Sequence, residues 1–451
     1  MDLSCFKAYD LRGRVPDQLN PILAEKIGRA YVEITGAKKV IVGYDIRLSS
    51  PEIADALSSG LMAAGADVFD IGLCGTEQVY FATSHYQMDG GIMVTASHNP
   101  KDHNGMKMVG PESRPISSDN GLNDIRDRVL EPFFDAAEQG KYETLEVMSA
   151  YVDHLLGYID ARSLKPMTIV CNAGNGGAGL VIDELEQHLP FDFTKVHHEA
   201  DGHFPNGVPN PILPENRSAT ADAVLQNGAA MGIAWDGDYD RCFFFDETGR
   251  FIEGYYIVGL LADQFLRKTG GGKVIHDPRL TWNTLDLVEA AGGEAIESKT
   301  GHAFIKQRMR DEDAVYGGEM SAHHYFRDFA YCDSGMIPWL LIAERLCQSG
   351  QTLSSLIDAR IEAYPASGEI NRTISDPAKV LAAMEALYSP GAKNVSYVDG
   401  LSVEFDNWRF NLRMSNTEPV VRLNVEARAD KALMEKKTEE LLAEMEKLNR
   451  G

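Results

Sequence analysis

Lys39-Val40-Ile41-Val42-Gly43-Tyr44-Asp45 is a short run of β-branched residues that ends in an acidic residue. A run of this kind favours a buried strand. Ser50-Pro51-Glu52 follows it and is typical of a helix start, with the serine as the cap and the proline at the first helical position. Ile53, Leu57 and Leu61 then recur at four-residue spacing, so we predict a helix with one apolar face.

The same order of elements occurs three times along the chain. Residues 67–71 predict the strand that follows the first helix. A second copy begins with a strand at 273–277 and ends with a strand at 294–296. The third copy, between them, has a strand at 168–171, a glycine-rich turn and a helix around 180–185. Strands that alternate with helices indicate parallel βαβ units, so three related α/β modules in tandem are expected.

The last part of the chain has a different pattern. Pro365-Ala366-Ser367-Gly368 is typical of a linker, and a helix is expected near 380–387. Three strand-like runs and a closing helix with Leu441, Met445 and Leu448 follow; the runs are 401–405, 408–412 and 420–425. The expected fold class is therefore α/β: three tandem modules with mixed or parallel sheets plus a C-terminal α+β domain. The predicted domains are 1–148, 149–250, 251–364 and 365–451.

Composition narrows the classes of function. The 451 residues include 43 Lys plus Arg and 67 Asp plus Glu, a formal net charge of −24. Hydrophobic residues at 44% and charged residues at 24% are typical of globular proteins. The acidic balance argues against general binding to nucleic acid or to an anionic membrane. An anionic small molecule would need a local cluster of Lys and Arg.

We expect a cytoplasmic protein. Residues 1–7 contain charges and no apolar signal segment. The longest apolar run, 336–343, is interrupted by Pro338 and is far shorter than the about 20 residues that span a bilayer. The six cysteines form no C-x-x-C motif and no close pair, which indicates reduced thiols.

One motif offers a nucleophilic or phosphorylatable serine, and a second offers a metal site, with a purely structural acidic turn as the simpler interpretation of the second. Thr95-Ala96-Ser97-His98-Asn99-Pro100 follows a predicted strand and places a serine in a tight turn, as ordinary turn chemistry also does. Lys107 could supply positive charge to the same pocket. Asp236-Gly237-Asp238-Tyr239-Asp240-Arg241 brings three carboxylates together, which suits a hard cation such as Mg²⁺ or Ca²⁺. An EF-hand is rejected because the sixth position is Arg241 and a strand follows.

Two later motifs could bind a sugar and a phosphate. Residues 317–324, Gly-Gly-Glu-Met-Ser-Ala-His-His, bring two glycines together with hydrogen-bonding side chains. Residues 413–419, Arg-Met-Ser-Asn-Thr-Glu-Pro, combine an arginine, two hydroxyls and turn amides, a suitable phosphate cradle. Alone, the first motif is weak, and a plain turn before proline explains the second equally well.

Residues 174–179 satisfy the G-x-G-x-x-G pattern after a strand and before a helix. A tight strand-to-helix turn explains them better than a dinucleotide site, because they lie in the middle module and Glu199 is poorly placed for a ribose. A nicotinamide-dependent oxidoreductase is kept as the alternative from a different class.

In this order, the four motifs resemble those of the α-D-phosphohexomutase superfamily over essentially the whole chain. The opening Lys7-Ala8-Tyr9-Asp10-Leu11-Arg12-Gly13 and Met320 resemble bacterial phosphomannomutases most. The resemblance implies four domains around a central cleft. It also implies interconversion of mannose 6-phosphate and mannose 1-phosphate for GDP-mannose synthesis, through a phosphoserine and a hexose 1,6-bisphosphate that also serves as activator.

The resemblance assigns a role to each candidate residue. Ser97 would carry the phosphoryl group, and Mg²⁺ would bridge it to Asp236, Asp238 and Asp240. The other residues are expected to bind substrate or neutralise charge: Arg12, Lys107 and Arg241 at the transferring group; Glu319, Ser321 and His323 at the sugar; and Arg413, Ser415, Asn416 and Thr417 at the other phosphate. The ligand would be a small phosphosugar, with neither nucleic acid nor membrane as a partner, and the enzyme a monomer or homodimer.

Three positions depart from the family pattern. Tyr239 stands where glycine is common in the metal loop, and Ala322 where glycine is usual in the sugar loop. Relatives often place a lysine base where this chain has Pro278-Arg279, and arginine is a poor base because it stays protonated. His302 is the substitute base that we infer, with a structural histidine as the alternative. The sequence leaves mannose against glucose open, so a phosphoglucomutase or a dual-specificity enzyme is the alternative.

Overall fold

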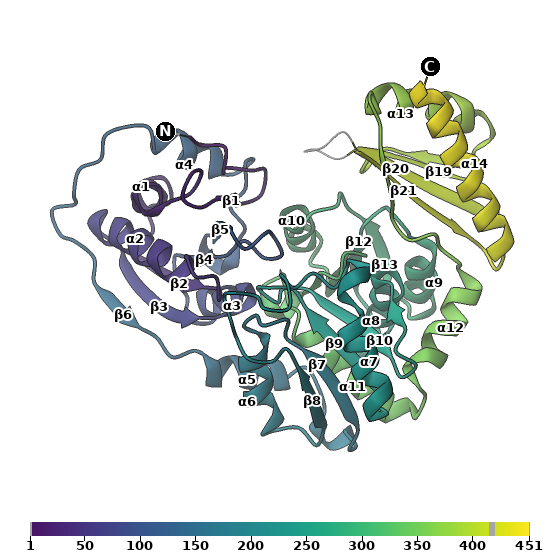
Figure 1. Cartoon of the computed structure of the whole chain (residues 1–451), viewed down its shortest axis with the longest axis horizontal. Coiled ribbons are helices and arrows are strands. Elements are labelled where there is room, and N and C mark those ends of the chain that lie inside the picture. The colour runs from purple at the N-terminus through teal and green to yellow at the C-terminus, as the bar shows by residue number, and fades with distance from the viewer. Residues whose placement is uncertain (1, 415–419, 451) are drawn as a thin grey trace. The chain divides into compact units, whose positions relative to one another are not determined.

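The computed structural model describes residues 2–414 and 420–450. They form two compact units, unit 1 within residues 1–251 and 323–350, and unit 2 within residues 252–322 and 351–451. Figure 1 follows the chain from purple at the N-terminus to yellow at the C-terminus.

The first sheet of unit 1 is mixed and has the strand order β1-β5-β4-β2-β3-β6. Strand β2 runs parallel to β3 and β4, whereas β5 runs antiparallel to β4 and β1. The strands are β1 (Leu11–Arg14), β2 (Lys39–Tyr44), β3 (Asp67–Leu73), β4 (Gly90–Val94), β5 (His103–Val109) and β6 (Tyr142–Thr144). The helices are α1 (Pro21–Thr35), α2 (Ser50–Ala63), α3 (Thr76–His85) and α4 (Leu122–Arg128).

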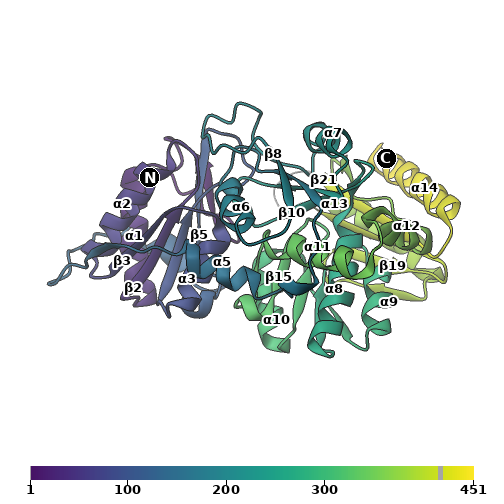
Figure 2. The ribbon, with the colours of Figure 1, turned by 90° about the horizontal axis from the view of Figure 1, so that it is seen from below.

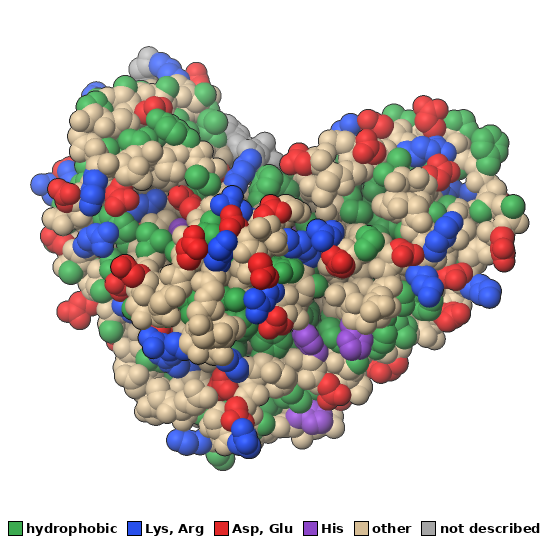
Figure 3. Space-filling view, turned by 180° about the vertical axis from the view of Figure 1, so that it is seen from behind, with side chains coloured by type: hydrophobic (Ala, Val, Ile, Leu, Met, Phe, Trp, Pro, Cys, Tyr) green, Lys and Arg blue, Asp and Glu red, His purple; other side chains and the backbone are tan. Residues whose placement is uncertain are grey.

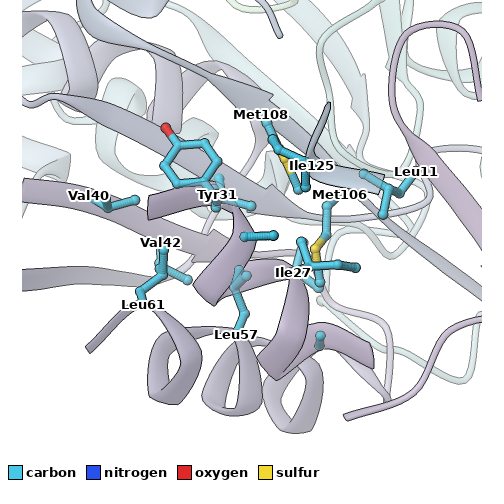
Figure 4. Packing of buried hydrophobic residues seen from close by; sticks show 14 of the residues in the cluster. Leu11, Ile27, Tyr31, Val40, Val42, Leu57, Leu61, Met106, Met108 and Ile125 are labelled. Carbon is cyan, nitrogen blue, oxygen red and sulfur yellow. The ribbon is translucent and has the colours of Figure 1, made fainter. Parts of the chain in front are cut away.

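Helices cover both faces of this sheet. Val40 and Val42 of β2 pack in one buried cluster with Tyr31 of α1 and Leu57 of α2 (Figure 4). Successive side chains of a strand point to opposite faces, so position 43 faces the other way. It is a glycine, and a Cβ there would lie 2.9 Å from the Val79 side chain of α3. Helix α3 therefore packs closely on the face opposite α1 and α2.

The rest of unit 1 contains a second sheet and a returning segment. Strand β7 is parallel to β8 and β9, and β9 and β10 form an antiparallel pair. The strands are β7 (Thr168–Asn172), β8 (Asp192–Val196), β9 (Met231–Trp235) and β10 (Cys242–Asp246). The short strand β11 (Phe251–Ile252) follows at the boundary between the units in the sequence. The helices are α5 (Met148–Leu156), α6 (Ala178–Glu186) and α7 (Ser218–Asn227). The returning segment has the antiparallel strands β15 (His324–Phe326) and β16 (Cys332–Asp333), followed by α11 (Ile337–Ser349).

Unit 2 has a parallel and an antiparallel part. Strand β12 is parallel to β13 and β14. The elements of this part are α8 (Gly254–Thr269), β12 (Lys273–His276), α9 (Trp282–Ala290), β13 (Glu294–Glu297), α10 (His302–Glu312), β14 (Tyr316–Gly318) and α12 (Leu353–Ala363). The antiparallel sheet has the order β17-β21-β20-β19-β18.

Two helices pack on the antiparallel sheet of unit 2. Figure 2 shows α13 and α14 close together, and both contribute to the same buried cluster as the strands. The elements are β17 (Ile370–Thr373), α13 (Pro377–Tyr388), β18 (Asn394–Ser396), β19 (Leu401–Glu404), β20 (Trp408–Met414), β21 (Val420–Ala427) and α14 (Lys431–Arg450).

The predicted fold class is confirmed. Each of the three strand-helix-strand copies is a parallel pair (β2 with β3, β7 with β8, β12 with β13), and the C-terminal part is α+β. The capping role predicted for Ser50 is wrong, because its hydroxyl donates instead to Asp45 Oδ1 at 2.6 Å. The buried Asp45 carboxylate needs donors, and Ser50 is one of them. The predicted boundaries and the central cleft stay predictions.

Charges of both signs are interspersed on the face of the molecule shown in Figure 3. No described helix combines the length and apolarity that crossing a membrane requires. All six cysteines are buried and free, as their spacing predicted.

Candidate active site

Ser97 lies in the loop after β4 and directly contacts the metal loop. Its hydroxyl donates to Asp236 Oδ2 at 2.8 Å, and its amide donates to Thr95 Oγ1 at 2.9 Å. Its φ of 50° is in the left-handed region, where a residue other than glycine is strained. The metal loop comes so close that a Cβ at position 237 would lie 2.6 Å from the Ser97 carbonyl oxygen. Gly237 is therefore needed for this approach.

Arg47, which was not predicted from the sequence, holds the serine loop through hydrogen bonds to its backbone. This fully buried guanidinium donates to the carbonyl oxygens of Ser97, Asn99 and Pro100 at 2.8, 2.7 and 2.7 Å. It also pairs with Asp45 at 3.3 Å. Asp45 in turn accepts the Thr95 hydroxyl at 2.7 Å. Arg47 lies between the predicted strand 39–45 and the helix that begins near residue 50. Ligand sites of α/β folds lie at the carboxyl ends of parallel strands, so an arginine at this position was a signal that could have identified it.

The three aspartates of the metal loop converge at the turn between β9 and β10. Their ligand atoms all lie within 4.8 Å of one another, and all three side chains are buried. One oxygen of each carboxylate, Oδ1, has no hydrogen-bond partner in the described part of the chain. Buried carboxylate oxygens without donors are costly. They are also the ligands that Mg²⁺ prefers, so these residues fit a divalent cation.

The second oxygen of each aspartate is fixed by protein donors. Asp236 Oδ2 accepts Arg241 Nη2 at 2.6 Å as well as the Ser97 hydroxyl. Lys107 Nζ donates to Asp238 Oδ2 at 2.6 Å and to Asp240 Oδ2 at 2.5 Å. The carboxylates are therefore oriented with one oxygen toward protein cations and the other free for a ligand.

Burial and mutual repulsion set the charges of this group. Burial, with the neighbouring Asp238, raises the pKa of Asp240 to about 6. Burial also opposes ionisation of Asp238, but Lys107 holds the pKa of that carboxyl below its ordinary value. Although burial opposes its charge, the two aspartates hold the pKa of Lys107 above its ordinary value. Lys107 therefore acts here as a fixed cation.

The Tyr239 side chain of the metal loop is accommodated by Gly75, which precedes α3. A Cβ at Gly75 would lie 2.2 Å from the tyrosine ring, so position 75 provides the space that the ring fills. The Tyr239 hydroxyl donates to Gln78 Oε1 of α3. The departure from the family pattern thus packs the metal loop against the start of α3.

Two more side chains, those of Arg12 and His98, lie at the serine loop. Arg12 donates to Asn99 Oδ1 of the serine loop at 2.7 Å. His98 Nδ1 lies 3.1 Å from the Ser97 hydroxyl, and the charge of Arg241 together with burial lowers the pKa of this histidine well below its ordinary value. His98 is therefore neutral, and its position beside the nucleophile was not singled out from the sequence.

Of the three residues expected at the sugar, His323 belongs to unit 1, whereas Glu319 and Ser321 belong to unit 2. Its Nδ1 lies 2.9 Å from Asp333 Oδ2 and 3.9 Å from Asp240 Oδ1. The structure thus brings His323 next to the metal loop. Asp240, His323 and Asp333 together form a second group with metal-ligand geometry that shares one aspartate with the first.

The other sugar-loop residues lie in unit 2, around Arg279. Glu319 Oε1 accepts the amide of Gly301 at 3.0 Å and lies 3.9 Å from Arg279 Nη2. Ser321 Oγ is 3.5 Å from the same Nη2. His302, the inferred base, begins α10 directly after Gly301. These residues therefore gather at one place in unit 2.

Arg279 is a buried cation tied to Asp277. It donates to both oxygens of that carboxylate, at 3.0 and 2.8 Å. Burial opposes its charge, but Asp277 outweighs burial and raises the pKa of Arg279. Arg413, from the predicted phosphate loop, donates to Glu369 Oε2 at 3.2 Å. Ser415, Asn416 and Thr417 lie outside the described residues.

The glycine-rich turn at 174–179 is explained by packing. A Cβ at Gly179 would lie 2.4 Å from the carbonyl oxygen of His198, and one at Gly176 would lie 2.9 Å from that of Gly237. The turn therefore needs glycines to lie against its neighbours, one of which is in the metal loop.

Comparison with known proteins gives the same assignment along the whole chain. Four family models match: phosphoglucomutase/phosphomannomutase alpha/beta/alpha domain I at residues 4–134, domain II at 149–249, domain III at 253–364, and the C-terminal domain at 369–444. A phosphomannomutase of Escherichia coli is 59% identical over 450 residues, 98% of this chain and 99% of the relative.

Two further proteins are similar over their full length. A protein of Xanthomonas campestris pv. campestris named phosphohexose mutases is 59% identical over 442 residues, 98% of this chain and 99% of the relative. A crystal structure of a phosphoglucomutase/phosphomannomutase family protein from Burkholderia thailandensis has a TM-score of 0.89 and 33% identity, covering 100% of this chain and 99% of that one.

Proposed function

The chain belongs to the phosphoglucomutase/phosphomannomutase family, and from this premise we propose that it is a phosphomannomutase that interconverts mannose 6-phosphate and mannose 1-phosphate. One observation carries the proposal: the Ser97 hydroxyl is hydrogen-bonded to Asp236 among three buried aspartates, each with one oxygen that has no hydrogen-bond partner among the described residues. A hydroxyl nucleophile beside a divalent-cation site is the arrangement that phosphoryl transfer requires.

Ser97 is the residue that carries the phosphoryl group between turnovers. The Ser97 hydroxyl donates to Asp236 Oδ2, so this carboxylate oxygen is placed to accept the proton that the hydroxyl loses as Ser97 Oγ takes up the phosphoryl group. The phosphoryl group passes to the free hydroxyl of the phosphosugar to give a hexose 1,6-bisphosphate. The other phosphate of that intermediate returns to Ser97 and restores the phosphoserine. The same bisphosphate would phosphorylate the unmodified enzyme, which explains its expected role as activator.

The cations around Ser97 stabilise the charge that develops on the phosphoryl oxygens. Mg²⁺, held by Asp236, Asp238 and Asp240 and by the phosphorylated Ser97, would neutralise part of that charge when bound. Lys107, Arg241 and Arg12 supply fixed positive charge, because their hydrogen bonds to carboxylates and to Asn99 hold them in place. Preorganised charge of this kind needs no rearrangement during the reaction.

Glu319, Ser321 and His323 bind the sugar in this proposal. Glu319 and Ser321 offer an acceptor and a hydroxyl for the sugar ring, and His302 is the base that activates the sugar hydroxyl. Arg413, with Ser415, Asn416 and Thr417, binds the phosphate that does not react. The product would serve GDP-mannose synthesis in the cytoplasm, and the enzyme would be a monomer or homodimer.

A dual-specificity phosphohexomutase is the second candidate. The phosphohexose mutases of Xanthomonas campestris are as similar to this chain as the Escherichia coli phosphomannomutase, 59% in each case. Mannose and glucose differ at one ring hydroxyl, so the contacts of Glu319 and Ser321 would decide between them.

A coupled assay tests the function. Mannose 1-phosphate is supplied with Mg²⁺ and a trace of hexose 1,6-bisphosphate to the wild type and to Ser97→Ala, with glucose 1-phosphate in a parallel assay. Turnover should disappear in Ser97→Ala and in wild type treated with a chelator. Comparable turnover of both sugars would favour the second candidate. A folded, phosphorylated wild type that turns over neither sugar would refute the proposal.

A further inference from the structure

Three arginines of unit 2 share one carboxylate, that of Glu369. Glu369 Oε2 lies 3.2 Å from Arg413 Nη2 and 3.5 Å from Arg279 Nη1, and its Oε1 lies 3.6 Å from Arg422 Nη1. Glu369 immediately precedes β17, whereas the arginines come from the loop after β12 and from β20 and β21. The cluster is therefore assembled from four separate parts of the chain.

The sheet register forces two of these positive charges together. Arg413 of β20 and Arg422 of β21 are directly opposite each other in the antiparallel pair. Like charges in this position repel each other. The next strand of the sheet, β17, pairs Asn371 with Arg422 and so brings Glu369 to the same edge. A carboxylate placed there removes the repulsion between the two guanidinium groups.

Glu369 offsets only part of the positive charge of these arginines, and it leaves some of their hydrogen-bond donors without a short contact. Charge-assisted N–H···O bonds are usually about 2.7–2.9 Å long, and all three contacts of Glu369 exceed that range. Arg279 makes a shorter contact with Asp277, 2.8 Å at its closest. The Nε atoms of Arg413 and Arg422 are buried and have no hydrogen-bond partner among the described residues. The arginines therefore retain donors for a further anion.

We propose that Glu369 is a built-in counter-ion that occupies the three-arginine site until a phosphate dianion displaces it. This inference rests on the proposed function, which brings a phosphosugar to Arg413. Arg413 Nη1 also lies 3.5 Å from Asp399 Oδ2, so a phosphate that bound Arg413 while Glu369 stayed in place would put three anions around one guanidinium. A dianion gains more from three arginines than a carboxylate does, and a monovalent anion gains no such advantage. Glu369 thus makes the site selective for phosphoryl groups over monovalent anions.

Calorimetric titration with inorganic phosphate tests this role without requiring turnover. The wild type and Glu369→Gln are titrated at a pH at which phosphate is a dianion. Removing the competing charge should lower the Kd for phosphate by about fivefold, the effect of a partly exposed ion pair. Glu385→Gln is the matched control, because Glu385 lies in the same unit and accepts a hydrogen bond from Tyr397. This control should leave the Kd unchanged.

The opposite sign would overturn the proposal. If Glu369 merely held the arginines in position, Glu369→Gln would weaken phosphate binding or leave it unchanged. A second variant, Glu369→Ala, sharpens the distinction because acetate can enter the vacated space. Acetate should compete with phosphate in this variant and have much less effect on the wild type. Acetate that improves phosphate binding to Glu369→Ala would show a positioning role and refute the counter-ion.

Arg413→Gln separates this inference from the proposed function. The wild type should bind phosphate, and Arg413→Gln should not. Binding that survives there would overturn both the counter-ion and the substrate role of Arg413. The mutase assay with Ser97→Ala is independent of these titrations. If the wild type is a mutase but Glu369→Gln binds phosphate no more tightly than the wild type, the counter-ion role is refuted and the proposed function is not.

Discussion

Arg47 shows how much of the candidate site depends on a residue that cannot touch the reacting atoms directly. Its guanidinium hydrogen-bonds the carbonyl oxygens of Ser97, Asn99 and Pro100 and so holds Ser97 at a φ of 50°. A strained residue persists only where its surroundings fix it. Losing this support should displace the nucleophile without removing any group that binds substrate.

We therefore expect Arg47→Lys to lower kcat by about 10²-fold, the effect of a nucleophile misplaced by about 1 Å, with little change in KM. Lysine keeps the buried charge but cannot reach several carbonyls at once. Steady-state kinetics measure the effect, and circular dichroism checks the fold. Arg29→Lys, whose arginine pairs with Glu25 and Asp135, is the control. An unchanged kcat in Arg47→Lys would remove the positioning role.

Lys107 gives a prediction on metal removal. It bridges the buried Asp238 and Asp240, so Lys107→Met leaves two carboxylates without their cation. In a chelator, the free energy of unfolding should fall by about 3 kcal/mol, because breaking a buried ion pair leaves an uncompensated charge. Mg²⁺ should restore much of the loss by neutralising the same carboxylates. Chemical denaturation with and without Mg²⁺ measures both effects.

Lys195→Met is the matched control for this prediction. Lys195 also bridges two carboxylates, Asp183 and Glu186, at 2.7 and 2.6 Å, but on the surface. Its loss should change the free energy of unfolding by no more than about 1 kcal/mol, since exposed pairs contribute little. If Mg²⁺ stabilised Lys107→Met no more than wild type, the assignment of the metal to these aspartates would be contradicted.

Among single residues, the sequence identified those within motifs and missed those that act across the fold. The close approach of Asp236, Asp238 and Asp240 follows from their spacing in one short loop. Arg47 lies 50 residues before Ser97, and nothing in local spacing relates the two. Tyr239 departs from the family pattern, and its ring fits because Gly75 has no side chain in the space that the ring occupies. Long-range contacts of this kind depend on tertiary packing.

At the scale of elements, three consecutive residues at the start of α3 contact two other segments: Thr76 and Gln78 contact the metal loop, and Glu77 contacts the returning segment. Thr76 Oγ1 donates to Asp238 Oδ2 at 2.6 Å, and Gln78 accepts the Tyr239 hydroxyl. Between them, Glu77 is buried and accepts the Ser334 hydroxyl at 2.8 Å and the Gly335 amide at 2.5 Å. One helix turn thus joins the metal loop to the returning segment 323–350.

Glu77 should make stability depend on pH. Burial raises its pKa to about 8 from an ordinary value of 4.5, even though hydrogen bonds to Tyr151, Ser334 and backbone amides oppose the shift. Between these values the folded protein keeps a proton that the unfolded chain releases. Its contribution to the free energy of unfolding is therefore complete below about 4.5 and declines as the pH rises toward about 8.

Thermal melts across this range test the effect. The Tm of wild type should fall with rising pH more steeply than the Tm of Glu77→Gln, which cannot ionise. Glu52→Gln, at an exposed position of α2, should keep the wild-type slope. Parallel slopes for wild type and Glu77→Gln would show that Glu77 is ionised in the folded protein throughout the range.

The elements themselves were the most predictable part of the structure. A β-branched run followed by a helical segment predicts the start of a βαβ unit, and each of the three predicted units contains a parallel strand pair. The second strand of the middle unit, β8, was not predicted. Helix caps were less predictable, since Ser50 bonds the buried Asp45 instead of its own helix. A buried carboxylate and the free backbone amides of a helix start can each bind the same hydroxyl. The local sequence does not show which of the two the hydroxyl binds.

At the scale of the whole molecule, the order of the motifs predicted the family, but the order of the chain concealed one packing relation. Residues 323–350 belong to unit 1, although the residues on both sides of them belong to unit 2. The segment is held by polar contacts: Trp235 Nε1 donates to the Gly335 carbonyl at 2.8 Å, and Glu77 accepts donors from Ser334 and Gly335. All three hydrogen bonds join residues at least 100 positions apart.

A shortened chain of residues 1–251 should therefore fail to fold cooperatively on its own. It would leave Glu77 buried without its donors from the returning segment, and each unsatisfied buried group costs about 1–3 kcal/mol. It would also remove Trp339, whose ring packs edge-on against the ring of Phe193 with 5.9 Å between the ring centroids. Thermal melts followed by circular dichroism measure the loss, and a peptide of residues 323–350 added in trans should restore a cooperative transition. The same peptide with Gly335→Pro lacks the amide that donates to Glu77 and should restore less. A cooperative melt of residues 1–251 alone would show that the segment is an accessory to unit 1 and that Glu77 finds other donors within it.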